Sequence, residues 1–369
     1  MRLDKAQMRG VVRHRGNLFG LVGAVALVAL APSMSWAQHE PEGYHLSGEV
    51  VIRSGDTGWD YNSIDPKRGH LFIAHRKAGL HVFDTKSGKF LKTLPNSEGT
   101  NTSALAEEFD RGIAGTTEGD VVLFSLSTLK PLTRYKSTTD GFDGAAYDKV
   151  TKRFVMVGEA ESETGRTPVL LFDGKSGAQL GSIEVDSIKV DAPRPDGKGN
   201  IFLPLRDKNA LAQIDIAKRE IVATYALENC DRPAALEVDT LNQRVFVGCR
   251  GAATGVPNMT VVDAKSGKQI VNLPIGRGVD EMMYDPIVQA IYSANGDDGT
   301  MTVIRHDGAD HYSVSATIGT RPRARTGVLD ESTGKIYLVT AQFVERYREG
   351  AEPDSHYLPN TFTVLTLSK

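Results

Sequence analysis

Acidic side chains recur at one position of a repeating pattern in this sequence. The pattern is marked by an aspartate ahead of a short apolar run, and the markers are Asp65, Asp110, Asp148, Asp196, Asp239, Asp285 and Asp330. The residues five positions before the markers are Asp60, Leu105, Asp143, Asp191, Ala234, Asp280 and Arg325. Equivalent positions of repeats that surround one axis face the same point, so we expect the four aspartates and Arg325 to lie close together.

Four carboxylates that converge with few lysines nearby repel one another unless a cation lies among them. Carboxylate oxygens are preferred ligands of Ca²⁺. The predicted ligand is a divalent cation such as Ca²⁺, or a cationic small molecule, and the predicted carboxylates are Asp60, Asp143, Asp191 and Asp280. Arg325 would orient an anionic part of the ligand. The alternative that these aspartates bind nothing stays open, because Asp at the start of a strand accepts hydrogen bonds from nearby backbone N–H groups.

Other patterns with known chemistry are weak or missing in the sequence. His75 and His81 are candidates for a transition-metal site, but no second histidine stands at ligand spacing from either one. The sequence has no CxxCH for covalent haem, no GxSxG, no P-loop and no Rossmann glycine motif. No catalytic residue is therefore identified, and no cofactor other than the possible cation is indicated.

One stretch, residues 64–94, contains a complete structural repeat. It has a turn at Asp65, Pro66 and Gly69, an apolar strand, a second apolar strand that ends at Asp84, and a third strand after a Ser-Gly turn. With the segment before Asp65, this makes four short antiparallel strands in about 45 residues, the length of a propeller blade. Seven markers spaced 38 to 48 residues apart predict an all-β, seven-bladed β-propeller with four-stranded blades. The aspartates would ring the end of the central channel where the innermost strands begin, which we call the entry mouth.

The two ends of the chain are expected to close the ring. Residues 45–53 resemble an outermost strand that no blade precedes, and residues 361–367 end the chain where an outermost strand is missing. Pairing them completes the last blade and removes an exposed edge. Residues 341–360 break the repeat, and their Gly, Pro and charged residues predict a loop on the entry-mouth side. A tolerated surface insertion without a function is the alternative.

The first 37 residues have the pattern of a secretory signal peptide. Five basic residues precede an apolar core at residues 18–31, and Ser35-Trp36-Ala37 supplies small residues for cleavage. The apolar core has 14 residues, which is short for a membrane span. We expect a single domain, residues 38–369, to be exported to the periplasm or beyond. This domain carries 38 basic and 45 acidic residues, which argues against generic nucleic-acid binding.

Four segments resemble the exported bacterial YncE-like branch of the YVTN-repeat propellers. They are GWDYNSIDPKRGHLFIAHR, CDRPAALEVDTLNQRVFVGCR, IGRGVDEMMYDP and ARTGVLDESTGKIYLVTA. The resemblance covers essentially the whole exported domain and implies an exported propeller. It also implies that Asn101, rather than Leu105, takes the ligand position of the second blade. Many relatives carry His there, so Asn101 departs from the family pattern.

The resemblance does not select one activity, because propellers host many functions. We expect a monomeric, non-catalytic scaffold that binds a small molecule or a protein at the entry mouth. One alternative is a metal-dependent hydrolase of the lactonase type, in which a cation polarises a carbonyl and a carboxylate acts as base. A subunit of a periplasmic oxidoreductase is a further alternative.

Two further predictions concern single residues near the entry mouth. Cys230 is expected to open an inner strand and Cys249 to end the next one, so the two would lie opposite each other and form a disulfide after export. The alternative is a pair of buried thiols. Trp59, the only tryptophan after residue 37, is expected to pack between blades because its neighbour Asp60 faces the channel.

Overall fold

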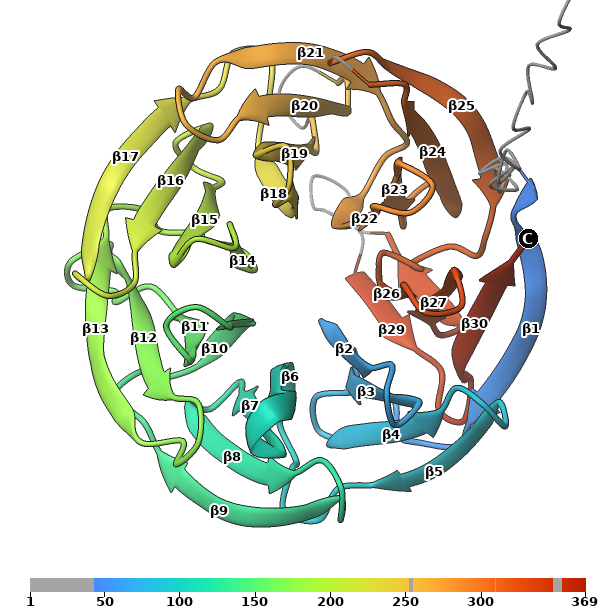
Figure 1. Ribbon diagram of the computed structural model, residues 1–369. Helices are drawn as coiled ribbons and strands as arrows, with labels where there is room; N and C mark the ends of the chain where they lie inside the picture. The colour runs from blue at the N-terminus through green and yellow to red at the C-terminus, as the bar shows by residue number, and fades with distance from the viewer. Residues whose placement is uncertain (1–42, 252–254, 309, 348–353) are drawn as a thin grey trace, which may run out of the picture. The chain divides into compact units, whose positions relative to one another are not determined.

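Seven four-stranded antiparallel sheets surround a central channel in the computed structural model (Figure 1). The structure describes residues 43–251, 255–308, 310–347 and 354–369. Within these ranges there is no α-helix, and one short 3-10 helix, η2 (Glu107–Phe109), lies between two strands of the second blade. The predicted all-β propeller with seven blades is therefore confirmed.

Each blade is built from strands that follow one another in the chain, listed here from the channel outward. Blades one to three contain β2 (Asn62–Asp65), β3 (His70–Ala74), β4 (Leu80–Asp84) and β5 (Lys89–Thr93); β6 (Thr100–Ala106), β7 (Arg111–Thr116), β8 (Asp120–Ser125) and β9 (Lys130–Lys136); and β10 (Phe142–Asp148), β11 (Arg153–Gly158), β12 (Thr167–Asp173) and β13 (Gln179–Val185). Blades four to six contain β14 (Arg194–Pro195), β15 (Asn200–Leu205), β16 (Ala210–Asp215) and β17 (Glu220–Ala226); β18 (Pro233–Asp239), β19 (Arg244–Cys249), β20 (Asn258–Asp263) and β21 (Gln269–Pro274); and β22 (Val279–Asp285), β23 (Ala290–Asn295), β24 (Thr300–His306) and β25 (Tyr312–Gly319).

The seventh blade joins the two ends of the described chain. Its strands are β26 (Thr326–Asp330), β27 (Lys335–Thr340), β30 (Phe362–Ser368) and β1 (His45–Ile52). The outermost strand β1 pairs antiparallel with β30, from His45 opposite Ser368 to Ile52 opposite Phe362. This pairing covers the edge of β30, so the predicted closure of the ring is confirmed.

The repeated marker aspartates shape the turns between the first and second strands. Asp65 ends β2 and its Oδ1 accepts the backbone N–H of Arg68 at 3.0 Å. Asp285 ends β22 and accepts the N–H of Ile287 at 2.9 Å in the same way. An Asp at this position satisfies turn N–H groups that would otherwise have no partner, which explains why the repeat carries it.

Apolar side chains of the second and third strands form cores between neighbouring blades. One such core joins Ile73 and Phe83 of the first blade to Val339 and Phe362 of the seventh. Trp59 lies in this core and is 2% exposed, which confirms that it packs between blades. Fully burying a side chain such as Phe362 contributes about 1.5–3 kcal/mol, so these cores supply much of the force that holds the blades together.

The prediction of a strand-free loop at residues 341–360 is wrong. The segment forms a β-hairpin in which β28 (Phe343–Arg346) pairs antiparallel with β29 (Asp354–Tyr357). Aromatic and β-branched residues such as Phe343 and Tyr357 favour strands. The Gly350 and Pro353 that suggested a loop lie outside the described residues.

No helix in the described ranges is long and apolar enough to cross a membrane. The predicted signal peptide, residues 1–37, lies outside these ranges.

Candidate functional site at the entry mouth

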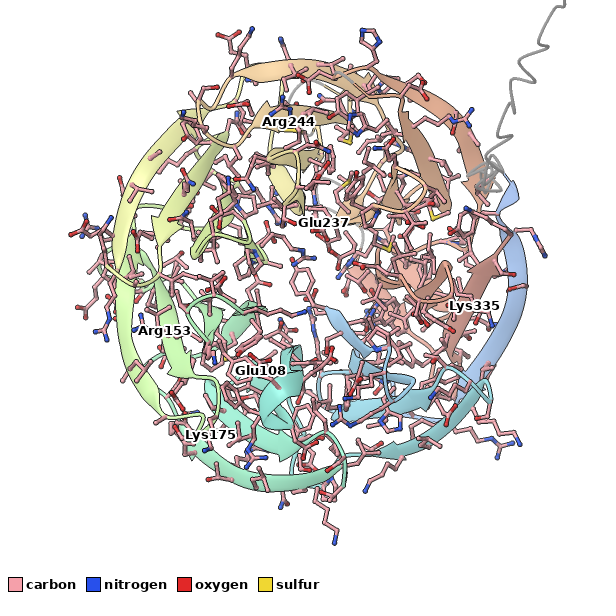
Figure 2. The ribbon with its side chains drawn as sticks, viewed as in Figure 1. Glu108, Arg153, Lys175, Glu237, Arg244 and Lys335 are labelled. Atoms are coloured by element: carbon pink, nitrogen blue, oxygen red, sulfur yellow. A yellow bond between two sulfur atoms is a disulfide. The ribbon has the colours of Figure 1, made fainter. Side chains whose placement is uncertain are left out.

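The predicted charged residues meet at the entry mouth of the channel. Asp143 and Asp280 are the second residues of β10 and β22, and Arg325 directly precedes β26. Asp60 and Asp191 stand two and three residues before β2 and β14 rather than at the strands' first residues. Asp60 interacts electrostatically with Asp143, Asp280 and Arg325, and Asp191 interacts with Asp143 and Asp280. Figure 2 shows side chains from several blades pointing toward the centre of the ring.

Each of the four aspartates has a basic partner that the sequence analysis did not identify. Arg76 Nη2 lies 3.0 Å from Asp60 Oδ2, and Arg206 Nη2 lies 2.5 Å from Asp191 Oδ1. Lys189 pairs with Asp143, and Arg250 pairs with Asp280. One of these partners is a lysine and three are arginines, so the chain itself supplies cations that offset the four carboxylates.

Three of these basic residues have a common place in the repeat. Arg76 follows β3 by two residues, and Arg206 and Arg250 directly follow β15 and β19. The second strand of a blade runs antiparallel to the innermost one, so it ends at the mouth where the innermost strand begins. A search for basic residues after each second strand would have found these three. Lys189 has no such signal, since it lies in the segment between β13 and β14.

Asp60, Asp191 and Asp280 differ in their affinity for protons. Burial raises the pKa of Asp60 to about 6, with Asp143 and Asp280 adding to the effect. Burial likewise raises the pKa of Asp191 to about 7, against the opposing charge of Arg206. Burial also acts on Asp280, but Arg250, Arg325 and Arg206 outweigh it and hold that pKa below its ordinary value. At neutral pH the mouth therefore contains a fully ionised Asp280 beside a partly protonated Asp191.

Asn101 is the contribution of the second blade to the mouth. It is 5% exposed and lies in β6. Its Oδ1 accepts a hydrogen bond from Arg76 Nε at 3.0 Å, and its Nδ2 donates to the Phe142 carbonyl at 3.1 Å. Asn101 therefore helps to orient Arg76 toward Asp60.

A pocket of about 450 Å³ opens beside these residues. Its polar lining includes Asp60, Arg76, Asn101, Asp143, Glu159 and Lys189, and its apolar lining includes Phe142, Ile188 and Val190. The other predicted residues, Asp191, Asp280 and Arg325, do not line this pocket and form a second half of the mouth. Asp60 and Lys189 connect the halves, because Asp60 interacts with Arg325 and Lys189 interacts with Asp191.

The mouth has no ready-made set of metal ligands. Among the described residues, no group of three or more His, Cys, Asp or Glu is arranged to hold a metal ion. The cation site at Asp60, Asp143, Asp191 and Asp280 stays a prediction. The arrangement is better suited to a ligand that accepts and donates hydrogen bonds, since both signs of charge converge there.

His75 and His81 form a closed hydrogen-bonded pair instead of a metal site. His75 Nε2 lies 3.1 Å from the Thr57 carbonyl, His75 Nδ1 lies 2.9 Å from His81 Nε2, and His81 Nδ1 lies 2.8 Å from Thr93 Oγ1. A carbonyl only accepts, so His75 Nε2 carries the proton, His81 Nε2 donates to His75, and Thr93 donates to His81. Burial lowers the two pKa values to about 4 and about 3. Both rings are neutral at pH 7, and all four ring nitrogens are occupied.

A second charged cluster lies along the innermost strands of blades four to six. Arg194 of β14 contacts Glu281 of β22, and its Nε lies 3.5 Å from Glu237 Oε2 of β18. Figure 2 labels Glu237 near the centre of the ring. Burial raises the pKa of Glu281 to about 8. Tyr61, next to Asp60, interacts electrostatically with the four mouth aspartates. The five-residue spacing did not single out these residues, because they occupy other positions of the repeat.

The hairpin β28–β29 lies beside the Asp60 segment. The rings of Tyr357 and Trp59 have their centres 4.7 Å apart. Arg323 donates to Glu345 Oε1 at 2.6 Å, which fixes the hairpin to the segment before β26. The insertion therefore contacts the wall of the entry mouth next to Asp60.

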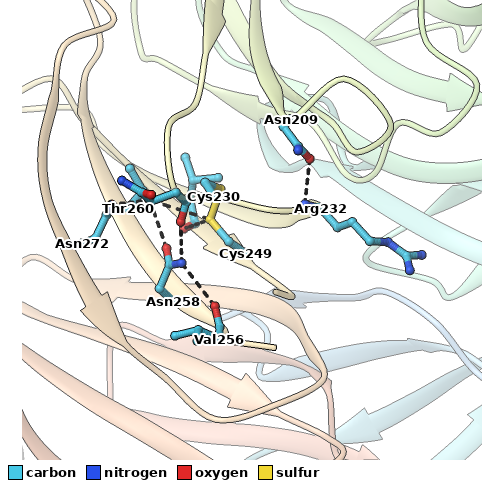
Figure 3. Close-up of a disulfide and its surroundings, with 10 residues drawn as sticks. Asn209, Cys230, Arg232, Cys249, Val256, Asn258, Thr260 and Asn272 are labelled. Carbon is cyan, nitrogen blue, oxygen red and sulfur yellow. Dashed lines mark hydrogen bonds between the residues drawn. A yellow bond between two sulfur atoms is a disulfide. The ribbon is translucent and has the colours of Figure 1, made fainter. Parts of the chain in front are cut away.

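The predicted disulfide between Cys230 and Cys249 is present (Figure 3). Their Cα atoms are 5.1 Å apart, and both side chains are buried. Cys249 ends β19 as expected, whereas Cys230 stands three residues before β18 instead of opening it. Arg250 follows Cys249 directly and reaches Asp280, so the bond anchors the part of blade five that supplies a mouth arginine.

Solved structures share the fold of this chain. No family model and no curated protein matches the chain. Among solved structures, U3-55K matches with a TM-score of 0.68 and 10% identity over 88% of this chain and 99% of that one. The WD40 repeats of RRP9 match with a TM-score of 0.68 and 10% identity over 87% and 97% of the two chains. Hydrazine synthase of Kuenenia stuttgartiensis matches with a TM-score of 0.66 and 13% identity over 80% and 95%. At these identities the likeness shows that this chain shares the β-propeller fold.

Proposed function

We propose that this protein is an exported, non-catalytic propeller that binds a small ligand or a partner protein through the entry mouth. The observation that carries the proposal is the convergence of Asp60, Asp143, Asp191 and Asp280 with five basic side chains beside a pocket of about 450 Å³. Pockets with a few converging polar groups and shifted pKa values are the usual places for ligand binding.

The proposal includes membership of the YncE-like group, cleavage of residues 1–37 and a periplasmic monomer. The buried Cys230–Cys249 disulfide supports export, because such bonds persist in oxidising compartments. Mass spectrometry of the protein from a periplasmic extract should give a chain that begins at Gln38. Light scattering should give the mass of one such chain, and a chain that keeps residues 1–37 would contradict the export proposal.

Ligand binding at the mouth can be tested with variants of its carboxylates. We expect Asp60→Asn and Asp280→Asn to weaken binding of the ligand or partner, while Asp307→Asn, an exposed aspartate between β24 and β25, leaves it unchanged. The measurements are calorimetric titration with Ca²⁺, Mg²⁺, Zn²⁺ and small charged molecules, and capture of partners from periplasmic extract. Binding that survives both mouth substitutions would place the functional surface elsewhere.

The same titration separates the proposal from the lactonase-type hydrolase. A lactonase-like site needs one ion held by at least three side chains, and it should lose both Ca²⁺ and activity when Asp60 or Asp280 is replaced. In the described mouth each carboxylate already contacts Arg or Lys, so we favour the binding scaffold. An oxidoreductase subunit would additionally need a bound redox cofactor or a partner chain.

A further inference from the structure

Three arginines from different blades surround one carboxylate of the entry mouth. Arg250 pairs with Asp280 Oδ1, and Arg206 Nη2 lies 3.9 Å from the same oxygen. Arg325 Nε lies 2.9 Å from Asp280 Oδ2. Asp280 is only 6% exposed and holds these three guanidinium groups within reach of one another. We call Arg206, Arg250 and Arg325 the arginine cluster.

The arginine cluster has more hydrogen-bond donors than its surroundings have acceptors. A guanidinium group offers five N–H donors. Within the described residues, Arg206 donates to Asp191, and Arg250 donates to Asp280 and to the Val279 carbonyl. Arg325 contacts Asp280 without the geometry of a hydrogen bond. Among the described residues, most of the donors of the cluster therefore have no hydrogen-bond acceptor.

Some of the unsatisfied donors are shielded from water. Arg206 Nε and Arg325 Nε are buried and have no hydrogen-bond partner within the described structure. One acceptor, Asp191 Oδ2, is also buried without a partner in the described structure, and it would be satisfied by a donor. Buried polar groups in proteins are nearly always satisfied, so the two Nε donors favour a ligand that brings hydrogen-bond acceptors to the mouth.

The charge balance of the cluster is also positive. The three arginines face Asp280, Asp191 and Asp60, and burial raises the pKa of Asp191 to about 7 and that of Asp60 to about 6, so that neither of these two carries a full negative charge at pH 7. Lys189 is a further positive neighbour of Asp191. The side chains of Arg250 and Arg325 are each 27% exposed, so a ligand can reach them from the channel. The cluster is thus a partly desolvated region with excess positive charge.

We propose that the arginine cluster binds the anionic group of a small ligand, a carboxylate or a phosphate. Planar guanidinium groups pair with such anions through two parallel hydrogen bonds, which gives both affinity and orientation. Asp280 acts as a positioning residue that holds the arginines together. This inference rests on the proposed function, and it assigns the ligand's anionic end to blades four to seven.

The test is calorimetric titration of residues 38–369 at low ionic strength, with inorganic phosphate, succinate and choline as probes. We expect at least one anion to bind at a single site, and Arg325→Gln and Arg206→Gln each to weaken it by about tenfold or more. Arg277→Gln is the matched control, because Arg277 has a side chain 69% exposed and contacts Asp298 outside the cluster. Binding of phosphate without succinate assigns a phosphate ligand, and the reverse assigns a carboxylate.

Circular dichroism checks whether Arg325→Gln folds. If it does not, Arg325→Lys replaces it as the test variant, because lysine keeps a positive charge beside Asp280. A lysine cannot form the forked pair, so we still expect weaker binding. Absence of anion binding by the wild type, or unchanged binding in both cluster variants, overturns the inference. Choline binding that depends on Asp60, without anion binding, overturns the anion assignment and leaves the proposed function standing. A partner protein whose capture depends on Asp60 but is unaffected by Arg325→Gln would likewise overturn the anion assignment and leave the proposed function standing.

Discussion

The protonation state of one buried carboxyl group in the channel, that of Glu281, affects the stability of the whole protein. Glu281 has a folded-state pKa of about 8 against an ordinary value of 4.5, because burial outweighs the attraction of Arg194. The other charged groups that act on it are Glu237 and Asp280. The folded state therefore holds a proton on Glu281 at pH values where the unfolded chain has lost it.

The first prediction is that the contribution of Glu281 to the free energy of unfolding falls as pH rises from about 4.5 to about 8, so that Glu281→Gln removes a downward slope from the pH dependence. In this window Glu281 is more protonated in the folded state than in the unfolded state, so its contribution decreases with pH by up to about 1.4 kcal/mol per pH unit. His75 and His81 act in the opposite direction below pH 6.5, so the test compares the variant with wild type. Gln resembles the protonated Glu. Urea unfolding at a series of pH values measures the slope.

The exposed residue Glu163 provides the matched control, Glu163→Gln, which should keep the wild-type slope. Equal slopes in wild type and Glu281→Gln would show that Glu281 ionises in the folded protein near its ordinary value.

The disulfide of the fifth blade can be removed by substitution to measure its contribution to stability. The Cys230–Cys249 bond closes a short loop, with a sequence separation of 19. We expect the double substitution Cys230→Ser and Cys249→Ser to lower the free energy of unfolding by about 2–4 kcal/mol, mainly because the unfolded chain gains freedom. Urea unfolding of the oxidised wild type and the variant measures the difference.

Wild type treated with reductant is the control for the disulfide, and it should resemble the double variant. Two free thiols in the denatured, unreduced periplasmic protein would contradict the presence of the bond.

The hairpin β28–β29 is the element most open to proteolysis. Its two strands pair only with each other in the described structure, and Arg346 is exposed. We expect limited trypsin digestion to cut at or beyond Arg346 first, while the ring stays folded and the fragments stay associated. Electrophoresis together with circular dichroism follows both events.

A matched variant, Arg346→Gln, should slow cleavage at that bond without changing the ring. Loss of the β-sheet signal together with the first cut would mean that the hairpin is required for the ring to fold.

Ring closure is a property of the whole molecule. Strand β1 covers the edge of β30 and buries Ile52 against the core between blades one and seven. We expect removal of residues 38–53 to lower the midpoint of thermal unfolding strongly and to promote association through the uncovered edge of β30. Thermal scans and size-exclusion chromatography test this, with a truncation that ends before His45 as control. A monomer of unchanged thermal stability would show that β1 does not contribute to closure.

The seven-bladed architecture could be predicted because the same pattern of a turn aspartate and an apolar strand recurs along the sequence. Six of the seven marker aspartates, among them Asp65 and Asp285, accept N–H groups of the turn that follows the innermost strand, so one local requirement recurs around the ring. Asp110 is the exception, since it accepts the N–H of Ser127. Cys230 and Cys249 could be paired because the segment that leads into β18 and the end of β19 lie at the same end of one blade. The hairpin at residues 343–357 was missed because Gly350 and Pro353 suggest a loop, whereas its strands depend on pairing with each other.

The spacing of the repeat was enough to predict that Asp60, Asp143, Asp191, Asp280 and Arg325 share one mouth, since equal spacing in a ring leads to equal positions. Arg76, Arg206 and Arg250 also have a common place in the repeat, after the second strand, but their pairing with particular aspartates follows from the folded ring. Lys189 has no signal in the repeat, and its contact with Asp143 is known from the structure alone. Ion pairing and pKa values depend on separations of a few ångströms and on burial, and these quantities exist only once the blades have closed around the channel.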